Sequence, residues 1–176
     1  ALKEAFGFTD GPLLSQFWSY LTHLLQGDLG TSIAYYPSPV VDAIGTGLIW
    51  TIGLTGVAVI VAFILGTSLG AIAAWNRGGW LDSVLPPVLS FIGAFPYFWL
   101  SMVALYVFGF GLDWVPLRHA YSDDLTPEFS WLFISDVMWH ALLPAVTLVV
   151  ATLGGWMLSM RNTMISVLGE DYIKMA

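Results

Sequence analysis

The sequence contains no cysteine and very little charge. Only 10% of its 176 residues are charged, whereas an average soluble domain has about 25%, and 57% are hydrophobic. Without cysteine, the chain can form neither a disulfide scaffold nor a thiolate zinc site. The apolar composition and the net charge of −7 exclude a disordered, collagen-like or nucleic-acid-binding protein. The composition and the mean hydropathy of +0.79 therefore indicate a membrane protein that contacts lipid.

Charged residues are absent from three long stretches of the chain. These stretches are 34, 30 and 24 residues long and lie between Asp42 and Arg77, between Asp82 and Asp113, and between Asp136 and Arg161. A bilayer core about 30 Å thick is crossed by about 20 apolar residues in a helix. We therefore predict an all-α, polytopic helix bundle in the cell inner membrane, with spans near 47–75, 84–111 and 138–160.

Three spans divide the connecting segments between the two sides of the membrane. Three basic residues lie on the side that holds the turn 76–83 and the C-terminal tail, and two lie on the other side. Arg77 and Arg161 stand at span ends, where a basic residue most strongly favours the cytoplasm. Turn and tail are therefore predicted to be cytoplasmic. The predicted organisation is an extracytoplasmic segment 1–46, a membrane region 47–160 with an outer loop 112–137, and a cytoplasmic tail 161–176.

Shorter helices are predicted in the segment 1–46. Behind Asp10-Gly11-Pro12, apolar residues recur with a period of 3.6 from Leu14 to Leu25. This amphipathic helix of about 14 residues is too short to span, and either lies on the outer membrane interface or packs on the rest of the protein. A second short helix is expected to begin at Pro39.

Small residues and prolines shape the predicted spans. Gly66 and Gly70 form a GxxxG step, which lets neighbouring helices approach closely. Pro86-Pro87 is expected in the first turn of the second span, where proline is tolerated. Pro96 lies inside that span, so it removes a backbone hydrogen bond and is expected to kink the helix, either as a hinge or as a static bend.

Hydroxyl side chains are the candidate polar contacts along a solute pathway. They are Thr51, Thr55, Ser90 and Ser101, with Pro96 as the candidate hinge. Such hydroxyls also commonly bond back to a carbonyl of their own helix.

The sequence offers no catalytic residue, bound cofactor or metal ligand set. Ser68 and His140 are the candidate nucleophile and base of a membrane enzyme, but they fall near opposite ends of their spans, roughly 25 Å apart at helical rise. The spans contain no Asp, Glu, Lys or Arg, which disfavours a proton-coupled carrier. The chain also lacks the Gly-Lys-Ser/Thr of a Walker A loop, so ATP would have to act from another subunit.

Three segments together match one family in order and spacing. They are Leu25-Gln26-Gly27-Asp28-Leu29-Gly30-Thr31-Ser32, Arg77-Gly78-Gly79-Trp80-Leu81-Asp82 and Gly169-Glu170-Asp171-Tyr172-Ile173-Lys174-Met175-Ala176. The motifs His140-Ala141-Leu142-Leu143-Pro144-Ala145 and Gly155-Trp156-Met157 also fit. The chain thus resembles the permease subunit of binding-protein-dependent ABC importers, in the dipeptide/oligopeptide/nickel group.

The resemblance implies a fold, a function and partners. The fold is that of type I ABC importer permeases, with three of a presumed six spans present. The function is ATP-driven import of peptides or similar small solutes by alternating access. The implied partners are a second permease subunit, two cytoplasmic ATPase subunits that bind ATP and Mg, and an extracytoplasmic solute-binding protein. The residues at or just before the implied ATPase-coupling helix are Glu170, Asp171, Tyr172 and Ala176. The alternative is a channel or secondary carrier without an ATPase.

Overall fold

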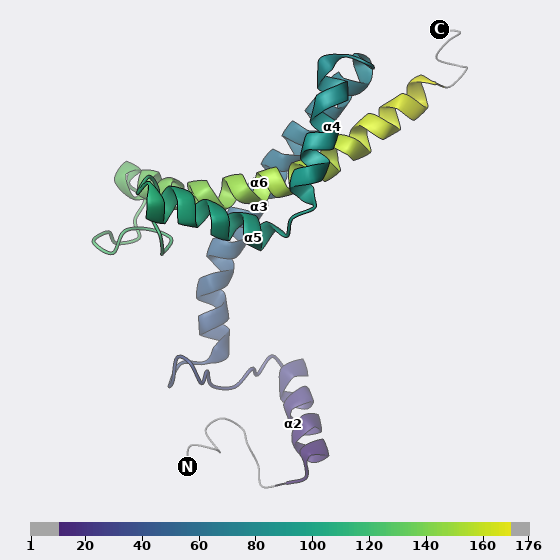
Figure 1. Ribbon diagram of the computed structural model, residues 1–176. Helices are drawn as coiled ribbons and strands as arrows, with labels where there is room; N and C mark the ends of the chain where they lie inside the picture. Colours follow the sequence, from purple (N-terminus) through teal and green to yellow (C-terminus); the bar gives the residue numbers. More distant parts are fainter. Residues whose placement is uncertain (1–10, 170–176) are drawn as a thin grey trace. The chain divides into compact units, whose positions relative to one another are not determined.

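The computed structural model describes residues 11–169, which form helices and loops (Figure 1). Among these residues, the β-type pairing is limited to one isolated bridge, between Thr31 and Pro39. The predicted all-α class is therefore confirmed. The chain divides into two compact units, residues 1–52 and 53–176, which are described separately.

The first unit contains a short helix and a hydrogen-bonded loop. Helix α2 spans Leu13–Leu25, and Gly27 follows it with a φ of +83°, which favours glycine. In the loop, the Val40 amide donates to the carbonyl oxygen of Gly30 at 3.0 Å. The separate short helix expected from Pro39 is wrong, because helix α3 begins at Val40 and continues without interruption to Trp75.

The second unit contains the last part of α3 and four further elements. They are α4 (Trp80–Gly93), α5 (Tyr97–Ala104), the π-helix η1 (Leu105–Gly111) and α6 (Trp131–Leu168). Helices α3 and α6 are each long and apolar enough to cross a membrane, and α4 with α5 and η1 makes a third candidate as one bent pair. The side of the membrane that each end faces stays a prediction.

The second predicted span is broken at Pro96. The axes on either side of the break differ by 91°, and α5 begins directly after this proline. The predicted kink is confirmed, and it is a complete interruption because Pro96 has no N–H to continue the helix. The position expected for Pro86 and Pro87 is wrong. Helix α4 begins at Trp80, so both prolines lie in its second turn rather than its first.

Helices α4 and α5 pack antiparallel to α6. Near the start of α4, Asp82 contacts Arg161 of α6, and at the next level Leu89 of α4 packs on Gly154. In α5, Ser101 contacts Thr147 of α6. Residue numbers thus rise along α4 and α5 while those of their α6 partners fall, and Figure 1 shows α4 beside the later part of α6 and α5 beside its earlier part.

Helix α3 runs parallel to α6 and touches it through two glycines. A Cβ atom at Gly66 would lie 2.6 Å from Cβ of Trp156, and one at Gly70 would lie 2.4 Å from the carbonyl oxygen of Met157. The GxxxG step therefore forms the close helix contact that its spacing predicts. Where the three helices meet, the core contains Ala73, Leu89 and Met157, of which Ala73 and Met157 are fully buried.

Candidate functional site

An ion pair joins α4 to α6 at the end of the helix pair next to the 76–79 turn. The Arg161 Nε donates to Oδ1 of Asp82, and the Gly78 amide donates to Oδ2 at 2.8 Å. Gly78 has a φ of +81°, which brings the turn back onto the carboxylate. The Asp82 side chain is only 7% exposed. These three residues, Gly78, Asp82 and Arg161, are called the ion-pair junction.

The charges of the ion-pair junction stabilise each other. The Arg161 guanidinium, followed by the Gly78 amide, lowers the pKa of Asp82 below its ordinary value of 3.8. The same hydrogen bond raises the pKa of Arg161. Both residues lie just outside the uncharged stretches that form the spans. The pair is therefore ionised at neutral pH and fixes the beginning of α4 against α6.

At the other end of α6, Asp136 holds the loop that precedes the helix. Its Oδ2 accepts from the Ser122 amide at 2.7 Å, and its Oδ1 accepts from the Ser122 hydroxyl at 2.8 Å. These bonds, the amide first, keep the pKa of Asp136 below its ordinary value. His140 lies one turn further along α6, with its side chain 7% exposed and its Nδ1 3.4 Å from Oδ2 of Asp136. His140 thus packs beneath the loop.

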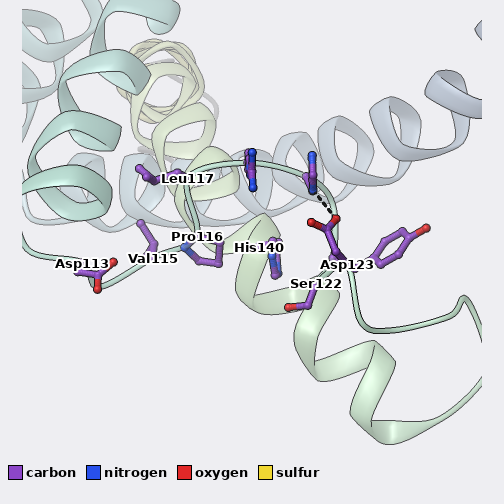
Figure 2. A pocket seen from close by; sticks show the side chains of 10 residues that line it. Asp113, Val115, Pro116, Leu117, Ser122, Asp123 and His140 are labelled. Atoms are coloured by element: carbon purple, nitrogen blue, oxygen red, sulfur yellow. Dashed lines mark ion pairs between the residues drawn. The ribbon is translucent and has the colours of Figure 1, made fainter.

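A pocket of about 310 Å³ lies between this loop and α6 (Figure 2). Its lining is Asp113, Val115, Pro116, Leu117, Arg118, His119, Tyr121, Ser122, Asp123 and His140. In Figure 2 the dashed line marks the pair between Nδ1 of His119 and Oδ1 of Asp123, which are 2.8 Å apart. We call this space the outer-loop pocket.

A deeper cavity of about 200 Å³ shares part of this lining. It has five residues in common with the outer-loop pocket and adds Ser101, Leu105, Leu143, Pro144 and Thr147. The Ser101 hydroxyl donates to Oγ1 of Thr147 at 2.9 Å, and the Thr147 hydroxyl donates to the carbonyl oxygen of Pro144 at 3.0 Å. The lining of this cavity therefore includes Arg118 of the loop and the Ser101–Thr147 hydroxyl pair between α5 and α6.

Replacing Asp136 by alanine is expected to release the outer loop from α6, because both of its bonds to Ser122 are lost. Limited proteolysis of the full-length subunit should then cleave within residues 112–130 faster than in the wild type. Asp124→Ala is the matched control, since Asp124 is an exposed carboxylate in the same loop. Equal cleavage rates in Asp136→Ala and the control would contradict the anchoring role.

Removing the hydroxyl pair is expected to have a small effect on stability. Hydrogen bonds between membrane helices contribute about 0.6 kcal/mol on average in double-mutant cycles. We therefore expect Ser101→Ala and Thr147→Val each to cost less than about 1 kcal/mol, with the double variant less destabilised than the two single effects added. Thermal unfolding of the four variants of the cycle measures this coupling, and strict additivity would show that the two hydroxyls do not interact.

The hydroxyls proposed for a pathway have different local surroundings. Ser101 lines the deeper cavity, whereas Thr51 donates back to the carbonyl oxygen of Gly47 at 2.9 Å. Thr55 and Ser90 are exposed. Pro96 forms the helix break, and its role as a hinge stays a prediction, as does the lining of a pathway by these residues. The expected coupling residues Glu170, Asp171, Tyr172 and Ala176 lie outside the described residues.

Ser68 and His140 do not form a catalytic pair. Gly66 and Gly70, on either side of Ser68, contact α6 between residues 153 and 161. His140 lies more than a dozen residues before this contact, which corresponds to about 20 Å along the helix. Within residues 11–169, no three His, Asp or Glu side chains gather as a possible metal site.

Arg118, Thr147 and Ser122 are site residues that the sequence analysis did not identify. Arg118 and Ser122 lie in a loop without periodicity, and a lone threonine in an apolar helix carries no signal of its own. The i, i+4 spacing of Asp136 and His140 could have indicated from the sequence that these two side chains lie together, because such residues share one helix face.

Comparison with known proteins identifies the family. Residues 66–176, which contain α4, α5, α6 and the outer-loop pocket, match the binding-protein-dependent transport system inner membrane component family. The chain belongs to this family. The predicted resemblance and the inner-membrane location are therefore confirmed. The ion-pair junction lies within the residues that match this family.

Similar proteins come from the peptide group of this permease family. The glutathione transport system permease protein GsiC of Salmonella choleraesuis (strain SC-B67) is 34% identical over 168 residues, covering 95% of this chain and 49% of the relative. The oligopeptide transport system permease protein AppB of Bacillus subtilis (strain 168) is 33% identical over 174 residues, covering 98% of this chain and 53% of the relative. The chain thus spans about half the length of these relatives.

Proposed function

We propose that this chain is part of the permease subunit of an ATP-driven importer for peptides or similar small solutes. The observation that carries the proposal is the family match over residues 66–176, together with relatives named for glutathione and oligopeptide transport. The subunit works by alternating access, so its helices form a pathway that opens to one side of the membrane at a time.

The arrangement of α4 and α6 supports this function. The ion-pair junction ties the first turn of α4 to α6 at Arg161, where the predicted tail begins. A push on the tail would therefore move both helices together, because the junction and the Leu89–Gly154 contact oppose sliding between them. Glu170, Asp171, Tyr172 and Ala176 are proposed to receive that push from an ATPase subunit.

Partners supply the energy and deliver the solute. Two cytoplasmic ATPase subunits are proposed to bind ATP and Mg, and this sequence contains no Walker A motif of its own. A second permease subunit completes the pathway, and an extracytoplasmic binding protein delivers the solute to the acidic outer segments.

Co-purification and uptake test the proposal. The full-length subunit, extracted in mild detergent from its own host, is expected to retain an ATPase subunit, and peptide uptake into cells should stop when ATP is depleted. A channel or secondary carrier predicts the opposite: no ATPase in the complex and uptake that survives depletion of ATP.

Reporter fusions test the orientation on which the coupling depends. A reporter active only in the periplasm should stay silent when it is fused after Gly78 and should be active when it is fused after Asp124. The reverse pattern would place the tail outside the cell, where a cytoplasmic ATPase cannot bind it.

A further inference from the structure

The outer-loop pocket contains one cation and one anion that the fold does not use. Asp113 and Arg118 both line it at its exposed rim, and neither makes an ion pair or a side-chain hydrogen bond with another described residue. The other charged groups around the pocket are engaged. Asp123 pairs with His119, and Asp136 accepts from Ser122. Asp113 and Arg118 are therefore the charged side chains of this pocket that are left to bind a ligand.

The backbone at the pocket is also held in an uncommon conformation. Among the described residues other than glycine, positive φ angles occur only at Asp113, with 54°, and at His119, with 66°. Both residues line this one pocket. Aspartate and histidine adopt such conformations more readily than most residues, and residues in this region also occur at ligand sites.

The pocket is open to the surroundings, has a polar lining and is as large as a small ligand site. Its volume of about 310 Å³ is at the lower end of the range for ligand pockets, about 300–1,000 Å³. The deeper cavity adds apolar walls from Leu105 and Leu143, and the Ser101–Thr147 hydroxyl pair also lines it. A molecule with two charged ends and one apolar branch matches this combination.

We propose that the outer-loop pocket binds a zwitterionic solute with an amino group and a carboxylate, such as a short peptide. Arg118 binds the carboxylate, for which a guanidinium offers two parallel N–H donors, and Asp113 binds the ammonium group. An apolar side chain of the solute occupies the deeper cavity. The inference rests on the proposed importer function and adds a solute-contact site within the permease itself.

Direct binding to the complete permease–ATPase complex tests this site. The complex is reconstituted in nanodiscs without the solute-binding protein and without nucleotide, and equilibrium dialysis measures radiolabelled dialanine. Arg118→Gln should weaken dialanine binding about tenfold or more, since hydrogen bonds to charged groups contribute that much. The same variant should leave the binding of C-amidated dialanine unchanged, and Arg118→Lys should restore part of the loss. Asp113→Asn should weaken dialanine but not its N-acetylated form.

Matched variants control for the folding of the loop. Asp124→Asn removes an exposed acidic charge from the same loop, and Arg77→Gln removes an exposed basic charge outside the pocket. Both should bind dialanine like the wild type, and all variants should elute as the intact complex.

Three results would overturn the site. They are no saturable dialanine binding in the wild type, unchanged binding in both Arg118→Gln and Asp113→Asn, or displacement of dialanine by phosphatidylethanolamine with the peptide acting only as a headgroup mimic. Each leaves the importer proposal standing if uptake still depends on ATP. Conversely, uptake without an ATPase would refute the importer while leaving dialanine binding measurable.

Discussion

Replacing Gly70 by alanine is expected to destabilise the folded subunit by disrupting the contact between α3 and α6. The added Cβ atom would lie 2.4 Å from the carbonyl oxygen of Met157 and 3.0 Å from Cβ of Met160. The first of these is a backbone atom and the second is a Cβ atom, and neither moves when a side chain changes its rotamer. A rotamer change therefore cannot relieve the clash. Overpacking of this kind costs about 1–3 kcal/mol and occasionally more. The melting temperature of the full-length subunit in detergent, followed by a fluorescent fusion, measures the loss.

Gly56 provides the matched control for this prediction. It lies in the same helix, but no heavy atom stands within 4 Å of a Cβ atom built there. Gly56→Ala should therefore be neutral or stabilise the helix by up to about 1 kcal/mol, because alanine is the better helix former. Gly66→Ala should resemble Gly70→Ala, since its Cβ would meet that of Trp156. Equal melting temperatures for Gly56→Ala and Gly70→Ala would show that α3 does not approach α6 through this face.

Replacing Arg161 by glutamine is expected to lower both the melting temperature and ATP-driven uptake. The substitution leaves the Asp82 carboxylate without its hydrogen-bonded cation although its side chain is only 7% exposed. A buried charge without a partner is more costly than the pair was favourable. Asp82→Asn should be milder, because an asparagine oxygen still accepts from the Gly78 amide and the long Arg161 side chain can extend toward the membrane surface.

Two comparisons isolate the ion pair from the loss of a side chain. Arg77→Gln removes an exposed guanidinium that also attracts Asp82 but makes no hydrogen bond to it, so this variant should cost much less than Arg161→Gln. Reversing both charges, as Asp82→Arg with Arg161→Asp, should recover part of the stability that Arg161→Asp loses by itself. If Arg161→Gln melts like Arg77→Gln, the ion-pair junction does not stabilise the subunit.

The pH dependence of this pair has a defined sign. Because the folded-state pKa of Asp82 is lowered, its contribution to stability is fully present above the ordinary value of 3.8 and is lost as the pH falls through the folded-state value. The difference in melting temperature between wild type and Asp82→Asn should therefore stay constant from about pH 5 to 8 and shrink only in stronger acid. A difference that already shrinks near neutral pH would contradict an ionised pair.

Several features of this protein were predictable because their causes lie within a few residues of one another. The uncharged runs predict membrane helices through the length that a bilayer requires. Pro96 predicts an interruption through its missing N–H, and Gly66 with Gly70 predicts a close helix contact through the absence of side chains. The prediction of a separate helix from Pro39 failed because nothing in the following residues stops a helix before Trp75.

Pairings between distant residues were not predictable. Asp82 and Arg161 are 79 residues apart, and both looked like ordinary charges at the ends of spans. The bonds from Ser122 to Asp136 and the conformation of Asp113 depend on the path of a loop that has no repeating pattern. Ser101 was identified as a polar candidate, but its partner Thr147 emerged only once α5 lay against α6.

The order of amino acids predicts the class, the candidate membrane segments and the family, because hydrophobic run length and short motifs are local properties of the chain. Tertiary structure alone decided which helix faces meet, which charges are paired and where a pocket opens. The physical reason is that an apolar membrane helix presents similar surfaces all round. Its partners are then selected by shape, by a few polar groups and by the bend at Pro96, and these act only after the helices have come together.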